Sequence, residues 1–342
     1  MSIGDSPRES LSQHSGDSPA WQPDPPSNPQ NLAIPADGTV LPPSLSHGAP
    51  FPPAFDWAQT WDAILRRAAQ TPNGITHVLA DGSERSQSYA DLYTQARRIA
   101  TGLTASQLAP GTPVILQVGD RSNFLAALWG CLLGGYVPVP LAIAPPNSSY
   151  PTKPTALDHA LHLLNGATLL TESSTHPPIH SSTHPLTLDT LPQTPTDLHP
   201  PLPLDALTLL ILTSGSTGQP KGVQLSRRNL FASTYGMATV NNLTPESVFL
   251  NWMPLEHVAS LVMFHLTPVV LGSSQIQVAN EWVLQDPLHW LDLLERHQAT
   301  ATWAPNFAYG LVCDALLERL KAEGKRLKAK GKRQKAKGRS TS

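Results

Sequence analysis

One segment of the sequence has residue types suited to binding phosphate. Gly215, Gly218 and Gly222 let the backbone approach a ligand closely and turn several N–H groups toward one point. Lys221 adds a mobile positive charge that suits phosphate. Four residues add hydroxyl donors: Thr213, Ser214, Ser216 and Thr217. The spacing therefore predicts a phosphate-binding loop over residues 213–222.

This loop differs from the common P-loop of nucleotide-binding proteins. That pattern requires Gly-x-x-x-x-Gly-Lys-Ser/Thr, whereas the sixth position counted from Gly215 is Pro220 and a glycine follows Lys221. A continuous apolar run at 207–212 precedes the loop, and a helix is expected from Arg227. We therefore expect the loop to lie between a buried strand and a helix, a usual place for ligands in an α/β sheet.

Strand-like and helix-like patterns alternate along the rest of the chain. The alternation predicts an α/β fold with mostly parallel sheets flanked by helices. The expected strands are 77–80, 113–118, 136–139, 168–170, 207–212, 249–251, 275–278 and 301–303. The expected helices are 122–133, 156–164, 227–238, 287–297 and 307–320, with a further amphipathic helix ending near Leu103.

Composition divides the chain into three parts. Residues 1–53 are rich in Pro and Ser and predict a disordered leader, and residues 54–318 hold the α/β domain. Within the domain, residues 172–203 are rich in Pro, Thr and His and are expected to form a solvated surface loop. These histidines lack a supporting Cys or carboxylate cluster, so no metal ligands are assigned.

The last part, residues 319–342, is strongly basic. It contains 11 Lys and Arg against one acidic residue, which leaves 12 basic and 24 acidic residues elsewhere. A short repeat without apolar partner positions predicts a disordered tail. Nonspecific contact with nucleic acid is an alternative reading of the tail, although the acidic domain argues against nucleic acid as the main partner.

Composition also bears on the compartment. Two cysteines far apart in sequence and an N-terminus without a signal-peptide pattern favour a reducing, cytoplasmic environment. The uncharged run at 124–146 is long enough to span a membrane, but Gly134, Gly135 and two prolines divide it. We therefore expect a buried helix, a turn and a strand there rather than a membrane span.

Residues 213–222 resemble the signature loop of the adenylate-forming, AMP-binding superfamily. Two flanking segments agree with this resemblance, Tyr89–Ala100 with the first conserved helix and Leu133–Val139 with the second motif. The resemblance covers about residues 57–317 and implies ligase chemistry with ATP and Mg²⁺. The loop, including Lys221, would hold the phosphates while a substrate carboxylate attacks the α-phosphate and displaces pyrophosphate. The acyl-AMP formed would then be captured by a thiol.

The segment Trp252–Val258 resembles the stretch of acyl and aryl acid ligases whose histidine, here His257, borders the carboxylate pocket. Amino-acid-activating relatives carry an aspartate where this chain has Val258. Because a buried ammonium group without a partner is costly, this resemblance implies a non-amino acid. Two alternatives stay open: Glu256 could pair with an ammonium group, and His257 could be a core histidine.

The segment Trp303–Tyr309 is similar to one in fatty-acyl-AMP ligases and in loading domains of hybrid polyketide and nonribosomal peptide synthetases. The resemblance implies substrate contacts by Asn306, Phe307 and Tyr309, although these aromatic residues could equally belong to the core. It also implies an acyl carrier protein or CoA as the acceptor of the acyl group.

The superfamily's later motifs, for adenine, ribose and a C-terminal lysine, are not found after Leu317. From the sequence we therefore expect an N-terminal fragment of a fatty or aryl acid ligase, inactive by itself unless a downstream synthetase polypeptide supplies the rest. Two alternatives remain, a non-catalytic ATP- or acyl-binding remnant and a basic-tailed protein associated with nucleic acid.

Overall fold

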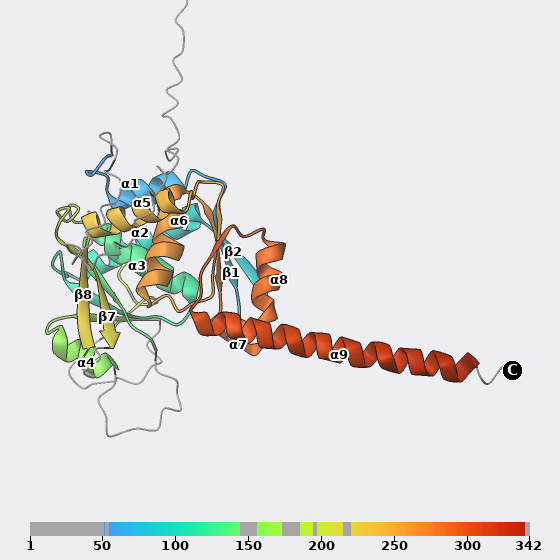
Figure 1. Ribbon diagram of the computed structural model, residues 1–342. Coiled ribbons are helices and arrows are strands. Elements are labelled where there is room, and N and C mark those ends of the chain that lie inside the picture. Colours follow the sequence, from blue (N-terminus) through green and yellow to red (C-terminus); the bar gives the residue numbers. More distant parts are fainter. Residues whose placement is uncertain are drawn as a thin grey trace, which may run out of the picture.

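The computed structural model describes residues 51, 55–143, 156–172, 185–193, 197–214 and 220–338. Almost all of the predicted leader therefore lies outside the described residues. The described part contains two mostly parallel sheets with helices packed against them (Figure 1). This arrangement confirms the predicted fold class.

The first sheet has the strand order β11-β9-β10-β1-β2. Its parallel strands are β11 (Ala301–Thr302), β9 (Val248–Asn251), β10 (Ser274–Val278) and β1 (Gly74–Val78). The edge strand β2 (Glu84–Ser88) runs antiparallel to β1 and was not predicted. Its side chains are mostly exposed and polar, so it lacks the apolar pattern that identifies a strand in the sequence.

The second sheet is entirely parallel and has the order β4-β3-β5-β6. Its strands are β4 (Val137–Pro140), β3 (Pro113–Gln117), β5 (Thr168–Thr171) and β6 (Leu186–Thr187). β6 lies inside the segment expected to be a solvated surface loop. That expectation is wrong for part of the segment, because Leu188 and Leu191 are buried in the main core and His199 hydrogen-bonds the carbonyl of Leu108. Asp189 and Thr190 between the two leucines are exposed, as expected. His176, His180 and His184 lie outside the described residues.

A layer of helices joins the two sheets. α2 (Tyr89–Ala105) begins with a capping box between Ser88 and Asp91. α3 (Arg121–Gly134) is apolar around its whole circumference and nearly all its residues are buried, as a central helix must be. It ends where Gly135 adopts a left-handed conformation, as the two glycines predicted. α1 (Trp61–Ala68) and α5 (Arg227–Val240) share the same core cluster.

The remaining helices complete the outer layers. α4 (Ala156–Leu163) packs near the second sheet, and α7 (Asn280–Gln285) and α8 (Leu288–Arg296) pack near the first. A π-helix, η1 (Ala259–Leu266), runs directly into α6 (Thr267–Leu271). Among the described residues, no helix combines the length and the apolar character needed to cross a membrane.

The predicted disordered tail is instead largely helical. α9 (Asn306–Gly338) continues through the basic repeat and projects away from the two sheets (Figure 1). After Pro305 the chain has no proline, and the basic half consists mostly of Lys, Arg, Ala and Leu, which favour helix. Exposed charges along a projecting helix are solvated and screened, so their repulsion does not prevent it. Residues 339–342 lie outside the described part.

Candidate phosphate and carboxylate site

The predicted phosphate loop connects two antiparallel strands. β7 (Leu207–Ser214) pairs with β8 (Pro220–Ser226), so that Thr213 lies opposite Lys221. β8 was not predicted and separates the loop from α5, which begins at Arg227 as expected. The sequence of β8 has just two apolar side chains, Val223 and Leu225, too few to identify a strand by periodicity.

The hairpin holds its end of the loop firmly against the second sheet. Leu210 of β7 is buried in a cluster with Ile115 and Val139 of the second sheet. A Cβ atom added at Gly222 would lie 3.1 Å from the Leu210 side chain, so the close approach of β8 favours glycine there. The predicted loop therefore connects two paired strands, of which β7 is packed against the second sheet.

Lys221 provides a cation at this base. Its side chain is exposed, and within the described residues no carboxylate or hydrogen-bond acceptor contacts it. Thr213 lies beside it, with its hydroxyl directed to the Lys221 carbonyl at 3.4 Å. Gly215, Ser216, Thr217 and Gly218 lie outside the described residues, and nothing is described of the Ser214 side chain. A lysine that has no partner among the described residues and that extends from a paired strand suits a phosphate ligand.

His257 lies in the connection between β9 and η1. It is exposed, so the interpretation of His257 as a core histidine is wrong. Its Nδ1 accepts the backbone N–H of Ala259 at 3.3 Å. In the neutral ring the proton therefore resides on Nε2, which is left as a donor.

The rings of His257 and Trp303 stack, with 6.4 Å between centroids and 27° between planes. This contact brings together the two segments expected to bind substrate, although β10 and the helices α7 and α8 separate them in the chain. Val258 beside His257 is 37% exposed and Trp303 is 36% exposed. Trp303 and Val258 thus form an aromatic and aliphatic surface next to the Nε2 donor of His257.

The predicted contact residues of α9 lie next to Trp303 in the sequence. Phe307 is 59% exposed and Tyr309 is 50% exposed, and Asn306 is also exposed. The alternative that these aromatic residues belong to the core is therefore wrong for Phe307. Tyr309 is anchored on one side, because its ring lies 5.5 Å from that of Trp290.

Arg121 is a cation near Glu256 that the sequence interpretation missed. Arg121, the first residue of α3, donates to Asn280 Oδ1 at 2.7 Å and to the carbonyl of Met253 at 3.4 Å. Burial lowers the pKa of Arg121 to about 10, while attraction to the carboxylates of Glu256 and Glu281 opposes this shift. The Glu256 carboxylate thus lies close enough to Arg121 for the two charges to attract one another.

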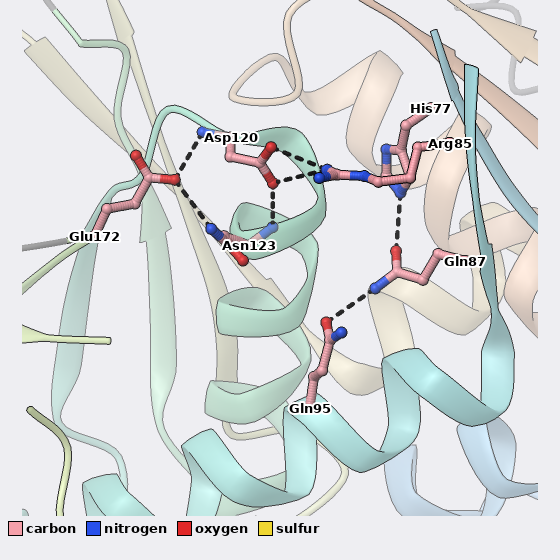
Figure 2. Close-up of polar contacts among 7 residues, drawn as sticks. All are labelled: His77, Arg85, Gln87, Gln95, Asp120, Asn123 and Glu172. Carbon is pink, nitrogen blue, oxygen red and sulfur yellow. Dashed lines mark hydrogen bonds and ion pairs between the residues drawn. The ribbon is translucent and has the colours of Figure 1, made fainter. Parts of the chain in front are cut away.

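An open cavity of about 380 Å³ lies where strands β1, β3, β4 and β10 end, and both Arg121 and Glu256 line it. Figure 2 shows the polar contacts that fix this edge. Asp120 caps α3 through the N–H of Asn123 and receives Arg85, at 3.0 Å for the shorter contact. Glu172 accepts from the N–H of Asp120 and from Asn123 Nδ2. The start of α3, and with it Arg121, is therefore held in place.

Neither Arg121 nor Asn251, which also contacts Met253, was predicted as a site residue. Each had only a weak signal: Arg121 is the charge immediately before a long uncharged run, and Asn251 is the polar residue that ends an apolar strand.

Among the described residues, no group of three or more His, Cys, Asp or Glu could hold a metal ion.

A comparison with protein families gives a match over residues 64–336 to the family described as AMP-binding enzyme. The chain spans only 25–29% of the length of the first curated relatives that it matches. It spans about half of each solved structure described below.

Three groups of solved structures resemble the chain. The complex of McyG A-PCP with phenylalanyl-adenylate is 36% identical, with a TM-score of 0.70 over 74% of this chain and 48% of that one. The adenylation domain of a keto acid-selecting nonribosomal peptide synthetase module, bound to keto acyl adenylate, is 36% identical, with a TM-score of 0.69 over 77% and 50%. A structure described under fatty acyl-adenylate ligases from E. coli and L. pneumophila is 27% identical, with a TM-score of 0.62 over 73% of this chain and 47% of that one.

Proposed function

This chain belongs to the AMP-binding enzyme family, and on that premise we propose that it binds the phosphates of ATP and a non-amino carboxylic acid for activation of the acid as an acyl-adenylate. The observation that carries the proposal is the pairing of His257 with Trp303, beside Val258. It joins a hydrogen-bond donor for a carboxylate with an apolar surface for the rest of the acid.

The phosphate part of the proposal rests on the β7–β8 hairpin. Lys221 would contact the phosphates, together with the hydroxyl and N–H groups of residues 213–218. ATP would supply the adenylyl group and pyrophosphate as the leaving group, and Mg²⁺ would accompany its phosphates. The packing of β7 against the second sheet supports this role, because it fixes the hairpin backbone from which the Lys221 side chain extends.

The carboxylate part rests on His257. The Ala259 N–H occupies Nδ1, so Nε2–H is the group that would donate to a carboxylate oxygen. This hydrogen bond would orient the carboxylate without transferring a proton to it. The second carboxylate oxygen would then be free to attack the α-phosphorus, with cleavage of the bond between that phosphorus and the pyrophosphate oxygen.

The surroundings of His257 favour an acid without an α-ammonium group. Val258 offers no charge to such a group, and the Glu256 carboxylate lines the cavity at the sheet edge, where it attracts Arg121. Exposed Trp303 and Phe307 would instead contact an aryl or alkyl chain. The similar structures that carry keto acyl adenylate or act as fatty acyl-adenylate ligases support this class, whereas the phenylalanyl-adenylate complex represents the competing class.

The acceptor in this proposal is a thiol, of a carrier protein or of CoA. The resemblance of residues 303–309 to loading domains favours the carrier protein, as does the similarity to a structure described as A-PCP. A synthetase polypeptide that continues the pathway from the acyl-adenylate is the corresponding protein partner.

The test is equilibrium binding by calorimetry with the full chain. We expect magnesium pyrophosphate to bind, and octanoate or benzoate to bind at least tenfold more tightly than phenylalanine. Preferential binding of phenylalanine would contradict the acid class, and no binding of any acid would contradict the function. Binding without acid-dependent ATP–pyrophosphate exchange would favour the alternative in which this chain only binds its ligands.

A further inference from the structure

Two side chains from different layers of the fold hold the backbone of Met253 in place. Asn251, at the end of β9, accepts the Met253 N–H at 3.1 Å and donates Nδ2–H to the Met253 carbonyl at 3.2 Å. Arg121, at the start of α3, donates to the same carbonyl through Nη1 and Nη2, at 3.4 Å each. One carbonyl thus receives donors from a strand of the first sheet and from the central helix.

Asn251 is itself fixed by a buried polar network. Its Nδ2 donates to Gln277 Oε1 at 2.9 Å, and Gln277 Nε2 donates to Gln275 Oε1 at 2.8 Å. Because Trp129 Nε1 is only a donor, it requires His265 Nε2 as acceptor, and His265 Nδ1–H then donates to Gln275. Every member is almost fully buried, so each amide has one orientation that satisfies its partners.

The held peptide lies four residues before His257, and a tight turn connects them. The His257 N–H donates to the Pro254 carbonyl at 3.2 Å, and Pro254 restricts its own φ. On the other side, the Leu261 N–H donates to the His257 carbonyl at the entrance to η1. Since both ends of this short connection are anchored, its backbone sets where the Cα–Cβ bond of His257 points, and the hydrogen bond from the Ala259 N–H to Nδ1 then orients the ring.

We propose that Asn251 and Arg121 are positioning residues. They hold the backbone of Met253 and thereby set the direction of the His257 ring toward Trp303. The consequence for carboxylic acid binding rests on the proposed function, whereas the effect on the His257 ring does not. A purely structural role would lower stability without altering the His257 ring or acid affinity. The two roles are therefore separable by experiment.

The experiment compares Asn251→Ala and Arg121→Lys with a control, Thr234→Ala. Thr234 is also buried and its hydroxyl donates to the Phe231 carbonyl, but it lies in α5 outside this network. One readout needs no ligand: the ring signals of His257 in NMR spectra of histidine-labelled full chain, assigned with His257→Gln. The second readout is calorimetric affinity for octanoate, benzoate and magnesium pyrophosphate.

We expect Asn251→Ala to shift the His257 signals and to weaken octanoate or benzoate binding about tenfold, with pyrophosphate affinity within about twofold of the wild type. Arg121→Lys should shift the His257 signals and weaken acid binding in the same way, but by less. If Asn251→Ala does not fold, the result for Arg121→Lys tests the positioning role. Thr234→Ala should change neither readout. Unchanged His257 signals in a folded variant overturn the proposal. If the wild type binds no acid, the proposed function fails, but the His257 signals still test the positioning role.

Discussion

The ring of Trp303 stacks on that of His257, at 6.4 Å between centroids, although β10, α7 and α8 lie between them in the chain. The contact exists because β11, which precedes Trp303, is hydrogen-bonded to β9, which precedes the His257 segment. Two chain segments that leave neighbouring parallel strands at the same edge must lie close together. The arrangement joins the two segments proposed to bind the acid into one surface, and the predictions below test its parts.

Lys221→Ala should weaken binding of magnesium pyrophosphate. A hydrogen bond between a charged donor and phosphate contributes about 1.5–3 kcal/mol, so the affinity should fall roughly 10- to 150-fold. Calorimetric titration measures the change. Lys321→Ala is the matched control, because Lys321 lies on α9 and pairs with Glu318. An equal effect of the two substitutions would show that only net charge matters, contrary to a specific role of Lys221.

Val258→Asp should shift preference toward amino acids. The new carboxylate would lie next to His257 and could pair with an α-ammonium group, while it would repel an approaching non-amino carboxylate. We expect phenylalanine affinity to rise and octanoate affinity to fall, each by several-fold, in paired titrations. Val258→Asn has a similar size without the charge and should change phenylalanine affinity little. A fall in affinity for both acids would count against a carboxylate pocket beside this position.

Acidification should destabilise the fold through His265. Burial holds the pKa of His265 at about 4, compared with 6.5 when exposed. As the pH falls from 6.5 to 4, the unfolded chain gains a proton here that the native chain does not. His265 therefore removes up to about 1.4 kcal/mol of stability per pH unit in this window and has no further effect below it. Urea unfolding at several pH values should show a steeper loss for the wild type than for His265→Gln, and parallel curves would contradict this.

Trp129→Phe should cost more stability than Trp290→Phe. Loss of the Trp129 N–H leaves His265 Nε2 buried without a donor and opens space in the core, at a cost of about 2–4 kcal/mol. Trp290 Nε1 donates to Thr302 Oγ1, which is only partly buried and so remains closer to solvent. Denaturant midpoints of the two variants give the comparison, and the reverse order would show that the buried network contributes little.

The main elements could be predicted because their signals are local. The capped apolar face of α2 and the apolar run of α3 ending at Gly134 and Gly135 each contain their own start and stop information. β8 and β2 gave no such signal, because both carry few apolar residues and most of their described side chains are exposed. The basic repeat was misread because charge repulsion was weighted above the helix propensity of Lys, Arg, Ala and Leu.

The residues of the candidate site also differ in how far the sequence could predict them. His257 and the predicted phosphate loop belong to contiguous motifs, so the sequence alone was enough to propose them. Arg121 and Asn251 act only because α3 and β9 meet at the Met253 carbonyl, a contact that depends on the order of strands in the sheets. No pattern within a single segment predicts such a contact, because it arises from packing between elements.

The most direct measurement places a bound acid relative to His257 and Trp303. Intermolecular nuclear Overhauser effects between benzoate and the full chain report which rings lie within contact distance of the ligand. We predict effects to the Trp303 indole and to the His257 ring, both lost in His257→Ala together with most of the affinity. Effects confined to residues of the cavity at Arg85 and Asp120, or benzoate binding that His257→Ala leaves unchanged, would contradict the account.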